Sequence, residues 1–467
     1  MSNDLWQPIR FDRDMVVKYD RPGPRYTSYP TAPQFQDDFC AADYARLLAR
    51  SGERDAVSPR PLSLYVHVPF CDVRCFFCGC NVTISRDRTW GKRYLPMLAR
   101  EMEKAAALLR ADRRLVQQVH WGGGTPTFLP AEDLAELMAL LRAHFRFAAD
   151  AEVGVEIDPR ECTAEQLDAL AAGGVNRLSL GLQDLNPQVQ KAVNRVQTVD
   201  ETWGLMAAAR ARGIDSLNVD LIYGLPFQTP ETFAATVDEV LRMSPDRLAL
   251  FNFAYLPAMF PHQRTIDPAA LPAPAAKLTM LEQSVAALTA AGYVFIGMDH
   301  FAKPSDPLAQ ALRDRTLTRN FQGYSTCAES DLVAFGVSSI SEVGGGYAQN
   351  AKVIRDYGNA LQEDRFATVK GLVMSDEDLL RHEVIMKVMC HFRLDKREVA
   401  GRHGIDFDRH FAAELASLAP MVDDGLVELG EHELEVTPRG RLLVRNVAIA
   451  FDSYLTAGTS TRFSRTV

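Results

Sequence analysis

The sequence predicts an α/β fold, with an extended arm before it and a mainly helical domain after it. From residue 64 onward, short runs rich in β-branched and apolar residues alternate with segments of helical periodicity. Six runs indicate strands, at 64–67, 116–121, 152–157, 177–180, 216–222 and 247–253. Helical periodicity fills 90–109, 131–144, 163–173, 201–212 and 230–243. Such alternation is typical of parallel strands with helices outside, in a partial barrel or in a doubly wound open sheet.

The composition of the chain excludes several classes of protein. With 467 residues, 47% of them hydrophobic, the chain can bury a large core. We expect an N-terminal arm at 1–60, a barrel with its extension at 61–370 and a C-terminal domain at 371–467. A net charge of −9 argues against nucleic-acid binding, and an anionic substrate would need a locally basic pocket. No apolar stretch is long enough for a membrane span, and the first residues lack the features of a signal peptide.

Four of the eight cysteines lie within ten residues: Cys71, Cys75, Cys78 and Cys80. This crowding argues against a disulfide framework and favours a reducing compartment, so we expect a cytoplasmic protein. Thiolates prefer iron–sulfur clusters or zinc, and a structural zinc site usually needs a second Cys-x2-Cys pair, which this chain lacks. The Cys-x3-Cys-x2-Cys spacing of the first three favours one [4Fe–4S] cluster with an open iron.

Polar residues and glycines gather where the predicted strands end. Three glycines at 122–124 follow the second strand, and glycine lets the backbone approach a ligand closely. Glu156 ends the third strand, where a carboxylate can accept both hydroxyls of a ribose. Each such residue alone is more often a cap or a loop hydrogen bond. Together, at the carboxyl ends of parallel strands, they predict a single cleft.

The cysteine loop, with Phe77 directly before the third cysteine, resembles the signature of radical S-adenosylmethionine (SAM) enzymes. The longer string Tyr65-Val-His-Val-Pro-Phe-Cys71, followed by Cys78-Gly-Cys80-Asn81, resembles the oxygen-independent coproporphyrinogen III oxidases, also called coproporphyrinogen dehydrogenases. This resemblance implies a partial (β/α)6 TIM-like barrel of the radical SAM type. It also implies that the first three cysteines bind the [4Fe–4S] cluster and that Cys80 does not.

The resemblance further implies two bound SAM molecules. The positions that match contacts to the SAM on the cluster are Tyr65, Phe77, Gly123, Glu156 and Ile340. Those that match contacts to the second SAM are Gly124, Thr125, Gln183, Arg195, Asp220 and Ala254. The chain does not depart from the family pattern at any of these positions.

The activity that the resemblance implies is the conversion of coproporphyrinogen III to protoporphyrinogen IX in haem biosynthesis, with two propionates becoming vinyl groups. The reacting CH2 hydrogen is not acidic, so no side-chain base could remove it. A 5′-deoxyadenosyl radical, formed from SAM by a reduced cluster, would take it as an atom. An electron donor and an electron acceptor are then needed as partners, and we expect the protein to act as a monomer.

Other residues are weaker candidates for substrate contact or catalysis. Arg21 and Arg25 lie in the proline-rich segment 19–30, which in this family runs over the active-site opening, and could meet substrate carboxylates. His300 follows a further predicted strand at 293–298 and is either a proton donor or an ordinary buried histidine. Cys80 is a fourth candidate of unassigned role.

The C-terminal domain begins with a capped helix at 375–390 and continues with a helix at 406–418. A hairpin (426–429 with 434–436) and a helix from Thr437 follow. Helices followed by a hairpin resemble a winged helix, which would suggest DNA, but the acidic hairpin argues against contact with phosphates. A lid or a substrate-holding domain is the better interpretation.

Three alternatives stay open. The haem chaperones of the same superfamily share the barrel but usually lack the fourth cysteine and the residues for a second SAM, so Cys80, Arg195 and Asp220 favour the enzyme. A radical SAM methyltransferase acting on haem would also use two SAM molecules. A zinc-binding scaffold without enzymatic activity is the most distant alternative.

Overall fold

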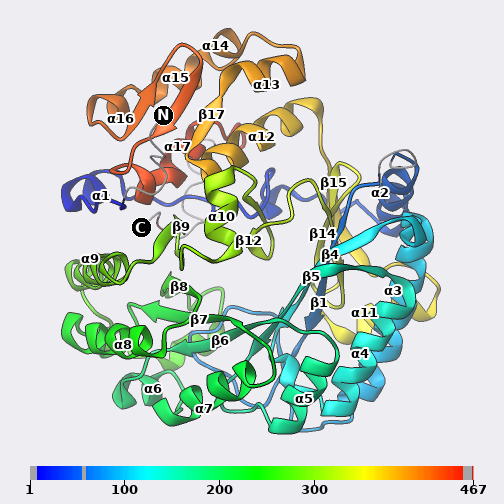
Figure 1. Ribbon diagram of the computed structural model, residues 1–467. Helices are drawn as coiled ribbons and strands as arrows, with labels where there is room; N and C mark the ends of the chain where they lie inside the picture. The colour runs from blue at the N-terminus through cyan, green and yellow to red at the C-terminus, as the bar shows by residue number, and fades with distance from the viewer. Residues whose placement is uncertain (1–7, 55–58, 456–464, 466–467) are drawn as a thin grey trace.

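The computed structural model describes residues 8–54, 59–455 and 465. One sheet dominates this part of the chain, and its twelve strands follow the order β16-β15-β14-β13-β1-β4-β5-β6-β7-β8-β10-β9. The sheet curves around the middle of the molecule, with most of its helices outside it (Figure 1). The first and last strands of this order are not paired with each other, so the barrel is open.

All six predicted strands are present at the centre of the sheet. They are β1 (Leu62–Val68), β4 (Leu115–Gly123), β5 (Arg146–Ile157), β6 (Arg177–Gln183), β7 (Ser216–Tyr223) and β8 (Arg247–Asn252), each parallel to the next. Their spatial order is their sequence order, without the reversal that defines a doubly wound sheet. The partial barrel is therefore confirmed, and the open doubly wound alternative is wrong.

The helices between these strands cover the outer face of the barrel (Figure 1). They are α3 (Trp90–Leu109), α4 (Ala131–His144), α5 (Ala164–Ala172), α6 (Pro187–Ala192), α7 (Val199–Arg210) and α8 (Pro230–Met243). Three of them begin at a threonine that forms a capping box with the third helical residue: Thr163, Thr198 and Thr229. Because the strands are covered by helices on one face and filled with side chains on the other, most of their residues are buried.

The sheet extends beyond the six units at both edges. Beside β1 lie β13 (Asp331–Phe335), parallel to it, and then the antiparallel strands β14 (Ile340–Val343), β15 (Gly346–Asn350) and β16 (Thr368–Val373). Beside β8 lies β10 (His300–Ala302), antiparallel to it, and β10 pairs in turn with the antiparallel strand β9 (Val294–Gly297). The sequence predicted β9 alone among these strands. The remaining elements between β1 and β16 are β2 (Phe70–Cys71), β3 (Thr83–Ile84), α9 (Pro274–Ala290), α10 (Pro307–Asp314), β11 (Thr318–Asn320), β12 (Gly323–Ser325) and α11 (Ile354–Gln362).

The N-terminal arm is only partly extended. Residues 20–31 contain no helix, as expected, and lie between α1 (Arg13–Tyr19) and α2 (Ala41–Arg54). The expectation of an extended arm over the whole of 1–60 is wrong at α1 and at α2. The helix α2 packs on α3 and on the β14–β16 extension. The arm is docked rather than solvated: Tyr26 and Tyr29 are buried, and their hydroxyls bond Asp452 and Ser453.

The C-terminal region packs above the barrel opening (Figure 1). It begins with α12 (Asp376–His391), capped by Ser375 as predicted, and contains a sheet of β17 (Arg393–Asp395), β19 (Glu433–Val436) and β18 (Val427–Leu429). The other helices are α13 (Lys396–His403), α14 (Phe407–His410), α15 (Ala412–Ser417), α16 (Ala419–Asp423) and α17 (Val444–Ala450). The helix predicted at 406–418 is broken into α14 and α15, and the one predicted from Thr437 begins only at Val444. Between Thr437 and Val444 the chain turns at Gly440 into a short 3-10 helix.

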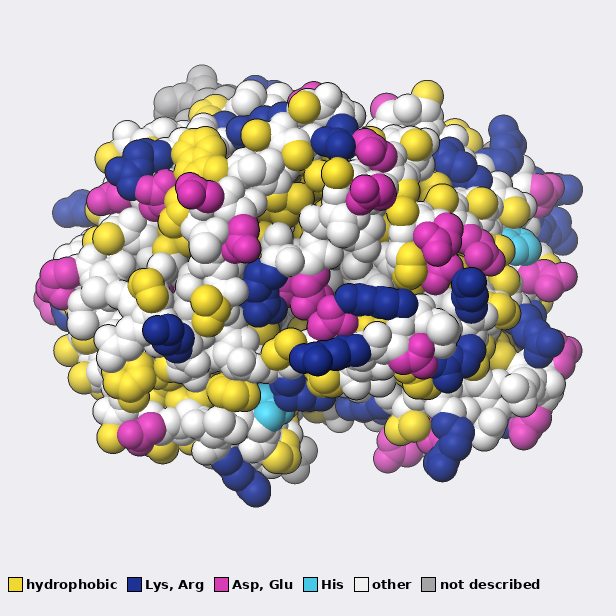
Figure 2. Space-filling view, turned by 90° about the horizontal axis from the view of Figure 1, so that it is seen from below, with side chains coloured by type: hydrophobic (Ala, Val, Ile, Leu, Met, Phe, Trp, Pro, Cys, Tyr) yellow, Lys and Arg dark blue, Asp and Glu magenta, His cyan; other side chains and the backbone are white. Residues whose placement is uncertain are grey.

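Surface charge on the face seen from below is mixed, with acidic and basic side chains interspersed (Figure 2). No helix within the described residues is long and apolar enough to cross a membrane.

Candidate active site

The cysteine loop forms one wall of a cavity of about 290 Å³ at the carboxyl ends of the barrel strands. The four cysteines of the loop, Cys71, Cys75, Cys78 and Cys80, all line it. The loop is held from neighbouring units: Asn194 donates its side-chain amide to the Arg74 carbonyl (2.9 Å), and Phe76 N–H donates to the Val193 carbonyl (2.9 Å). The predicted strand–loop junction therefore presents its thiols to the strand ends.

Hydrogen-bond donors are directed at the sulfur atoms. Arg195 Nη1 lies 3.5 Å from Cys75 Sγ, and the Cys80 N–H donates to Cys78 Sγ at 3.4 Å. Hydrogen bonding from Cys80 lowers the pKa of Cys78 to about 6 and correspondingly raises that of Cys80, whereas burial raises the pKa of Cys71 to about 12. Donors around sulfur suit thiolates that bind iron, since they stabilise the charge that the ligand retains.

The chemistry of the donor set fits an iron–sulfur cluster. The four thiols of the loop line one cavity, and thiolates are soft ligands that suit such clusters. A [4Fe–4S] cube held by three thiolates places each of them on a separate iron.

Most of the residues matched to the two SAM molecules line this same cavity. They are Phe77, Gly123, Gly124, Thr125, Glu156, Gln183, Arg195 and Asp220. Three others do not. Tyr65 stacks on His120 (ring centroids 6.1 Å apart) just behind Glu156, Ala254 lines an adjoining cavity, and Ile340 packs against Phe35, Tyr347 and Leu372.

Glu156 presents a carboxylate to the cavity from the end of β5. Its oxygens accept hydrogen bonds from His120 Nε2 (3.1 Å) and from the Gly123 N–H (3.2 Å). Burial raises the pKa of Glu156, but these hydrogen bonds and the charge of His120 outweigh it, so the pKa lies below its usual value. The side chain is still 44% exposed, so the ionised carboxylate can accept hydrogen bonds from ligand hydroxyls.

The glycine run at the end of β4 is required by close packing beneath the cavity. A Cβ at Gly122 would lie 2.7 Å from the Glu156 carboxyl group, and one at Gly123 would lie 2.4 Å from the His67 ring. Gly123 also has a φ of +105°, in the region that favours glycine. The run thus allows the Glu156 carboxylate and the backbone to approach each other where they face the cavity.

Arg195 is held by a carboxylate that was not among the predicted site residues. Asp158 accepts from Arg195 Nη1 (2.9 Å) and from Arg160 Nη2 (2.6 Å), and these guanidinium groups keep its pKa low despite burial. Glu161 lines the same cavity, and burial, with Asp158 nearby, raises its pKa to about 7. Both acids follow Glu156 within five residues at one strand end, which was the available signal.

Two further side chains, those of Asp220 and Gln183, offer hydrogen-bond acceptors to a ligand. Asp220 accepts from Asn218 (2.8 Å) and Ser179 (3.2 Å), and burial, with Glu156 nearby, raises its pKa to about 6. Within the described ranges, the buried Oε1 of Gln183 has no hydrogen-bond partner, although Gln183 lines the cavity. A buried acceptor without a partner is costly, so a ligand N–H or O–H would be favoured there. These features fit a polar nucleotide such as SAM.

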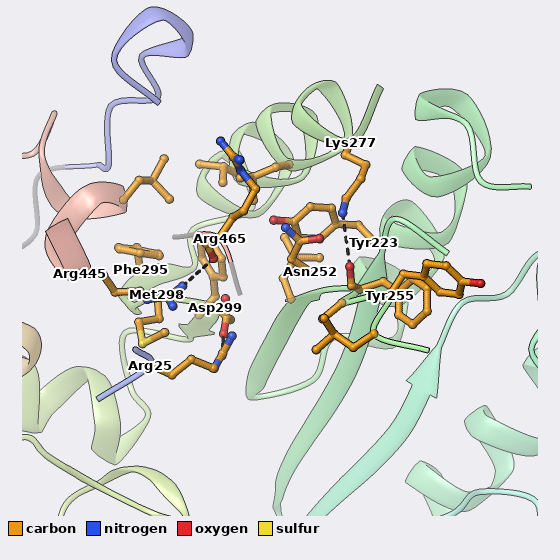
Figure 3. Close-up of a pocket in the computed structure, with 18 residues that line it drawn as sticks. Arg25, Tyr223, Asn252, Tyr255, Lys277, Phe295, Met298, Asp299, Arg445 and Arg465 are labelled. Atoms are coloured by element: carbon orange, nitrogen blue, oxygen red, sulfur yellow. Dashed lines mark hydrogen bonds and ion pairs between the residues drawn. The ribbon is translucent and has the colours of Figure 1, made fainter. Parts of the chain in front are cut away.

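A second cavity, of about 310 Å³, lies at the end of β8, where its lining residue Asn252 directly follows Phe251 of the cysteine cavity. Figure 3 shows the residues that line the second cavity. Arg25 lines it and pairs with Asp299, and its guanidinium lies 5.8 Å from the centre of the Phe251 ring. Phe251 in turn lines the cysteine cavity. Arg21, by contrast, donates to the Asn446 carbonyl (3.3 Å) of α17 and lines neither cavity.

His300 lies on β10, between the rings of Phe251 and Tyr324 (6.0 and 5.4 Å). Burial, together with the positive charge of Arg319, lowers its pKa to about 3, so the ring is neutral at physiological pH. Its Nδ1 has no partner within the described part of the chain. The neutral ring is therefore a hydrogen-bonding group rather than a source of acidic protons near pH 7.

Comparisons with known proteins identify the family. Residues 65–240 match the Radical SAM superfamily, and residues 374–443 match the HemN C-terminal domain. The oxygen-independent coproporphyrinogen III oxidase of Salmonella typhimurium is 47% identical over 96% of each chain, and that of Pseudomonas aeruginosa is 46% identical over 98% of this chain and 99% of its own.

A solved structure agrees with the sequence comparisons. Coproporphyrinogen III oxidase (HemN) from Escherichia coli, described as a radical SAM enzyme, superposes with a TM-score of 0.91 and 46% identity. The match covers 96% of this chain and 100% of that one. The chain therefore belongs to the oxygen-independent coproporphyrinogen III oxidase family of the radical SAM superfamily.

Proposed function

We propose that this protein converts coproporphyrinogen III to protoporphyrinogen IX without oxygen, as an oxidoreductase of haem biosynthesis. The observation that carries the proposal is the cysteine loop, whose thiols share one cavity with the residues matched to SAM. Relatives spanning nearly the whole chain bear the name of this activity.

We infer that Cys71, Cys75 and Cys78 hold a [4Fe–4S] cluster and that two SAM molecules bind beside it. When bound, these groups supply the 5′-deoxyadenosyl radical that takes a hydrogen atom from the substrate. Cys80, whose N–H donates to the Cys78 sulfur, is not a ligand in this proposal. Three thiolate ligands would leave one cluster corner for SAM.

The chain's own residues would bind and orient the nucleotides. Glu156 is placed to accept hydrogen bonds from ribose hydroxyls, and Gln183 Oε1 and Asp220 offer acceptors on neighbouring strands. Arg195, fixed by Asp158, offers a cation beside the cysteine loop. Phe251 and Phe77 are apolar walls that limit the access of water to reactive species.

The electron balance requires outside partners. Each propionate that becomes a vinyl group loses one hydrogen atom, one carbon dioxide and one electron. An external donor must reduce the cluster, and an external acceptor must take the electron left after decarboxylation. We expect a monomer, which the sedimentation of the loaded protein would test.

One alternative is disfavoured by the composition of the cavity. A haem chaperone of the same superfamily would not need Cys80, Arg195 and Asp220 together at the cysteine cavity, yet all three line it. A methyltransferase acting on haem would also bind a tetrapyrrole with carboxylates, so the products of the reaction distinguish it from the oxidase.

An anaerobic assay tests the proposal. Reconstituted protein is incubated with SAM, a reductant, an electron acceptor and coproporphyrinogen III. We expect 5′-deoxyadenosine, carbon dioxide and the divinyl product to appear together. Transfer of haem or of a methyl group without carbon dioxide release would refute the proposal.

A further inference from the structure

The second cavity has an excess of positive charge. Arg25, Lys277, Arg445 and Arg465 line it, and Asp299 is the one acidic residue among its described lining residues. Figure 3 shows these cations coming from different parts of the chain, with Lys277 above Asn252 and Tyr255 and Arg445 on the opposite side. Asp299 is already paired with Arg25, and Arg465 with Asp20. Lys277 and Arg445 are therefore the two cations to account for.

Lys277 is a partly buried ammonium on α9 without a carboxylate partner among the described residues. Its Nζ donates to the Phe253 carbonyl at 3.3 Å, and no described carboxylate lies within ion-pair distance of it. Its stem passes Gly224, where a Cβ would lie 2.6 Å from the lysine Cε. Burial lowers the pKa of Lys277, against a small opposing effect of Asp20. A lysine guided into a cavity without a counter-charge indicates that an anion arrives from outside.

Arg445, on α17, shows the same imbalance. It is 4% exposed, and its partners within the described part of the chain are neutral carbonyls, those of Pro24 (3.0 Å), Arg465 (3.0 Å) and Gly23. Burial and the charge of Arg25 lower its pKa to about 10. Arg319, behind it, is also buried and has no carboxylate partner within the described ranges. Several cations thus surround a single carboxylate in a poorly solvated space, which favours binding of further anions.

We propose that this cavity, between β8, α9 and α17, holds propionate carboxylates of the tetrapyrrole substrate, with Lys277 and Arg445 as their ligands and Arg25 at the side facing the cysteine cavity. This inference rests on the proposed function and adds to it the residues that orient the substrate. Arg25 is suited to the border position because it lies over Phe251, which belongs to the first cavity. A substrate anchored here presents its remaining pyrrole rings toward the SAM residues.

The shape and lining of the space agree with such a ligand. Between the cations the cavity wall is apolar, formed by Phe253, Leu281 and Phe295 among others. A neighbouring cavity of about 610 Å³ shares Tyr223, Asn252, Lys277, Leu281 and Arg465 with it, so the two form one groove. Apolar walls with cations at a few points match an apolar macrocycle that carries carboxylates at its edge.

The test is anaerobic equilibrium binding of coproporphyrin III, the oxidised form of the substrate, to the cluster- and SAM-loaded protein, followed by porphyrin fluorescence. Lys277→Met should weaken this binding about ten- to a hundredfold, because a hydrogen bond to a charged group is lost. Lys92→Met, which removes an exposed lysine from α3, is the matched control and should bind as the unchanged protein does. A porphyrin with all its carboxylates esterified should bind weakly and equally to both variants.

Asp299→Asn is an independent test of the same binding. It removes the carboxylate that competes with the substrate for Arg25, so it should not reduce the affinity for coproporphyrin. Lys277→Met binding equal to that of the unchanged protein, a loss of SAM affinity in place of porphyrin affinity, or weaker binding by Asp299→Asn would each overturn the inference. If the unchanged protein binds coproporphyrin but makes no divinyl product, the proposed function fails instead.

Discussion

Replacing Arg195 with methionine separates its contribution to the active site from its contribution to stability. The guanidinium pairs with Asp158 (2.9 Å), donates to the Gly181 carbonyl (3.0 Å) and approaches Cys75 Sγ (3.5 Å). Arg160 pairs with the same carboxylate at 2.6 Å and lies 4.0 Å from Cys75 Sγ, but it does not line the cavity. Arg160→Met is therefore a matched control, because it removes an ion pair with Asp158 and a longer contact with the same sulfur but no residue of the cavity lining.

The expected loss of stability can be bounded from these contacts. A buried carboxylate left without any partner costs about 3–5 kcal/mol. In either variant Asp158 keeps one arginine, so the loss should be nearer to the value for one charged hydrogen bond, about 1.5–3 kcal/mol. Both variants should therefore unfold at similar, slightly lower denaturant concentrations.

Their activities should differ. With a cation lost beside the SAM residues, Arg195→Met should lower turnover about tenfold or more while retaining its iron and sulfide, because one charged contact corresponds to at least a factor of ten. Arg160→Met should keep most of its activity. Anaerobic formation of 5′-deoxyadenosine, with iron and sulfide analysis of the same samples, measures both quantities. Equal turnover in the two variants would refute a ligand-binding role for Arg195, and loss of the cluster in Arg195→Met would make its role structural.

Three further outcomes are expected. Serine at any of the three proposed cluster cysteines should abolish iron binding, whereas Cys80→Ser should retain it. The iron content of the reconstituted variants measures this, and equal iron content in all four variants would contradict the expectation. Asp220 has a pKa near 6 when folded and near 4 when unfolded, so its contribution to stability falls as the pH rises from about 4 to about 6. Asp220→Asn should therefore be more stable than the unchanged protein at pH 7.5, by about 1–3 kcal/mol, but less active. Denaturant titrations at pH 7.5 measure the difference, and equal stability of the two proteins would argue against the raised pKa of Asp220. Gly122→Ala should displace the Glu156 carboxylate and weaken SAM binding about tenfold or more. Gly204→Ala, whose added Cβ would have no atom within 4 Å, should leave SAM binding unchanged, and calorimetry of SAM binding compares the two variants.

The sequence was sufficient for the six strand–helix units because their signals are local. Each strand is a short apolar run and each following helix has its own periodicity, so the central barrel could be predicted without knowing its contacts. The extension could not. Strand β13 is five residues long and pairs with β1 from about 270 positions away, so no local pattern indicates the pairing. The prolines and glycine at 22–30 predict an extended segment there, but they say nothing about residues 41–54, which form α2.

The site divides in the same way. The cysteine loop follows β1, and Glu156 and Asp220 lie near the carboxyl ends of β5 and β7, so the position of strand ends was enough to group them. The residues of the second cavity could not be predicted from a local sequence pattern. Lys277 comes from α9 and Arg445 from α17, about 170 residues later. Neither residue stands in a motif, and what distinguishes them is the missing counter-charge, which only the three-dimensional arrangement reveals. Arg25 was a candidate because its segment resembles the family's N-terminal arm, and it lines that cavity.

Electron paramagnetic resonance of the reduced, reconstituted protein, recorded with and without SAM, tests most directly whether three thiolates leave an iron corner open. Binding of SAM to that corner should change the signal of the reduced cluster, and Cys80→Ser should give the same change. A signal that SAM leaves unaltered, or a cluster that is lost when Cys80 is replaced, would contradict the central claim.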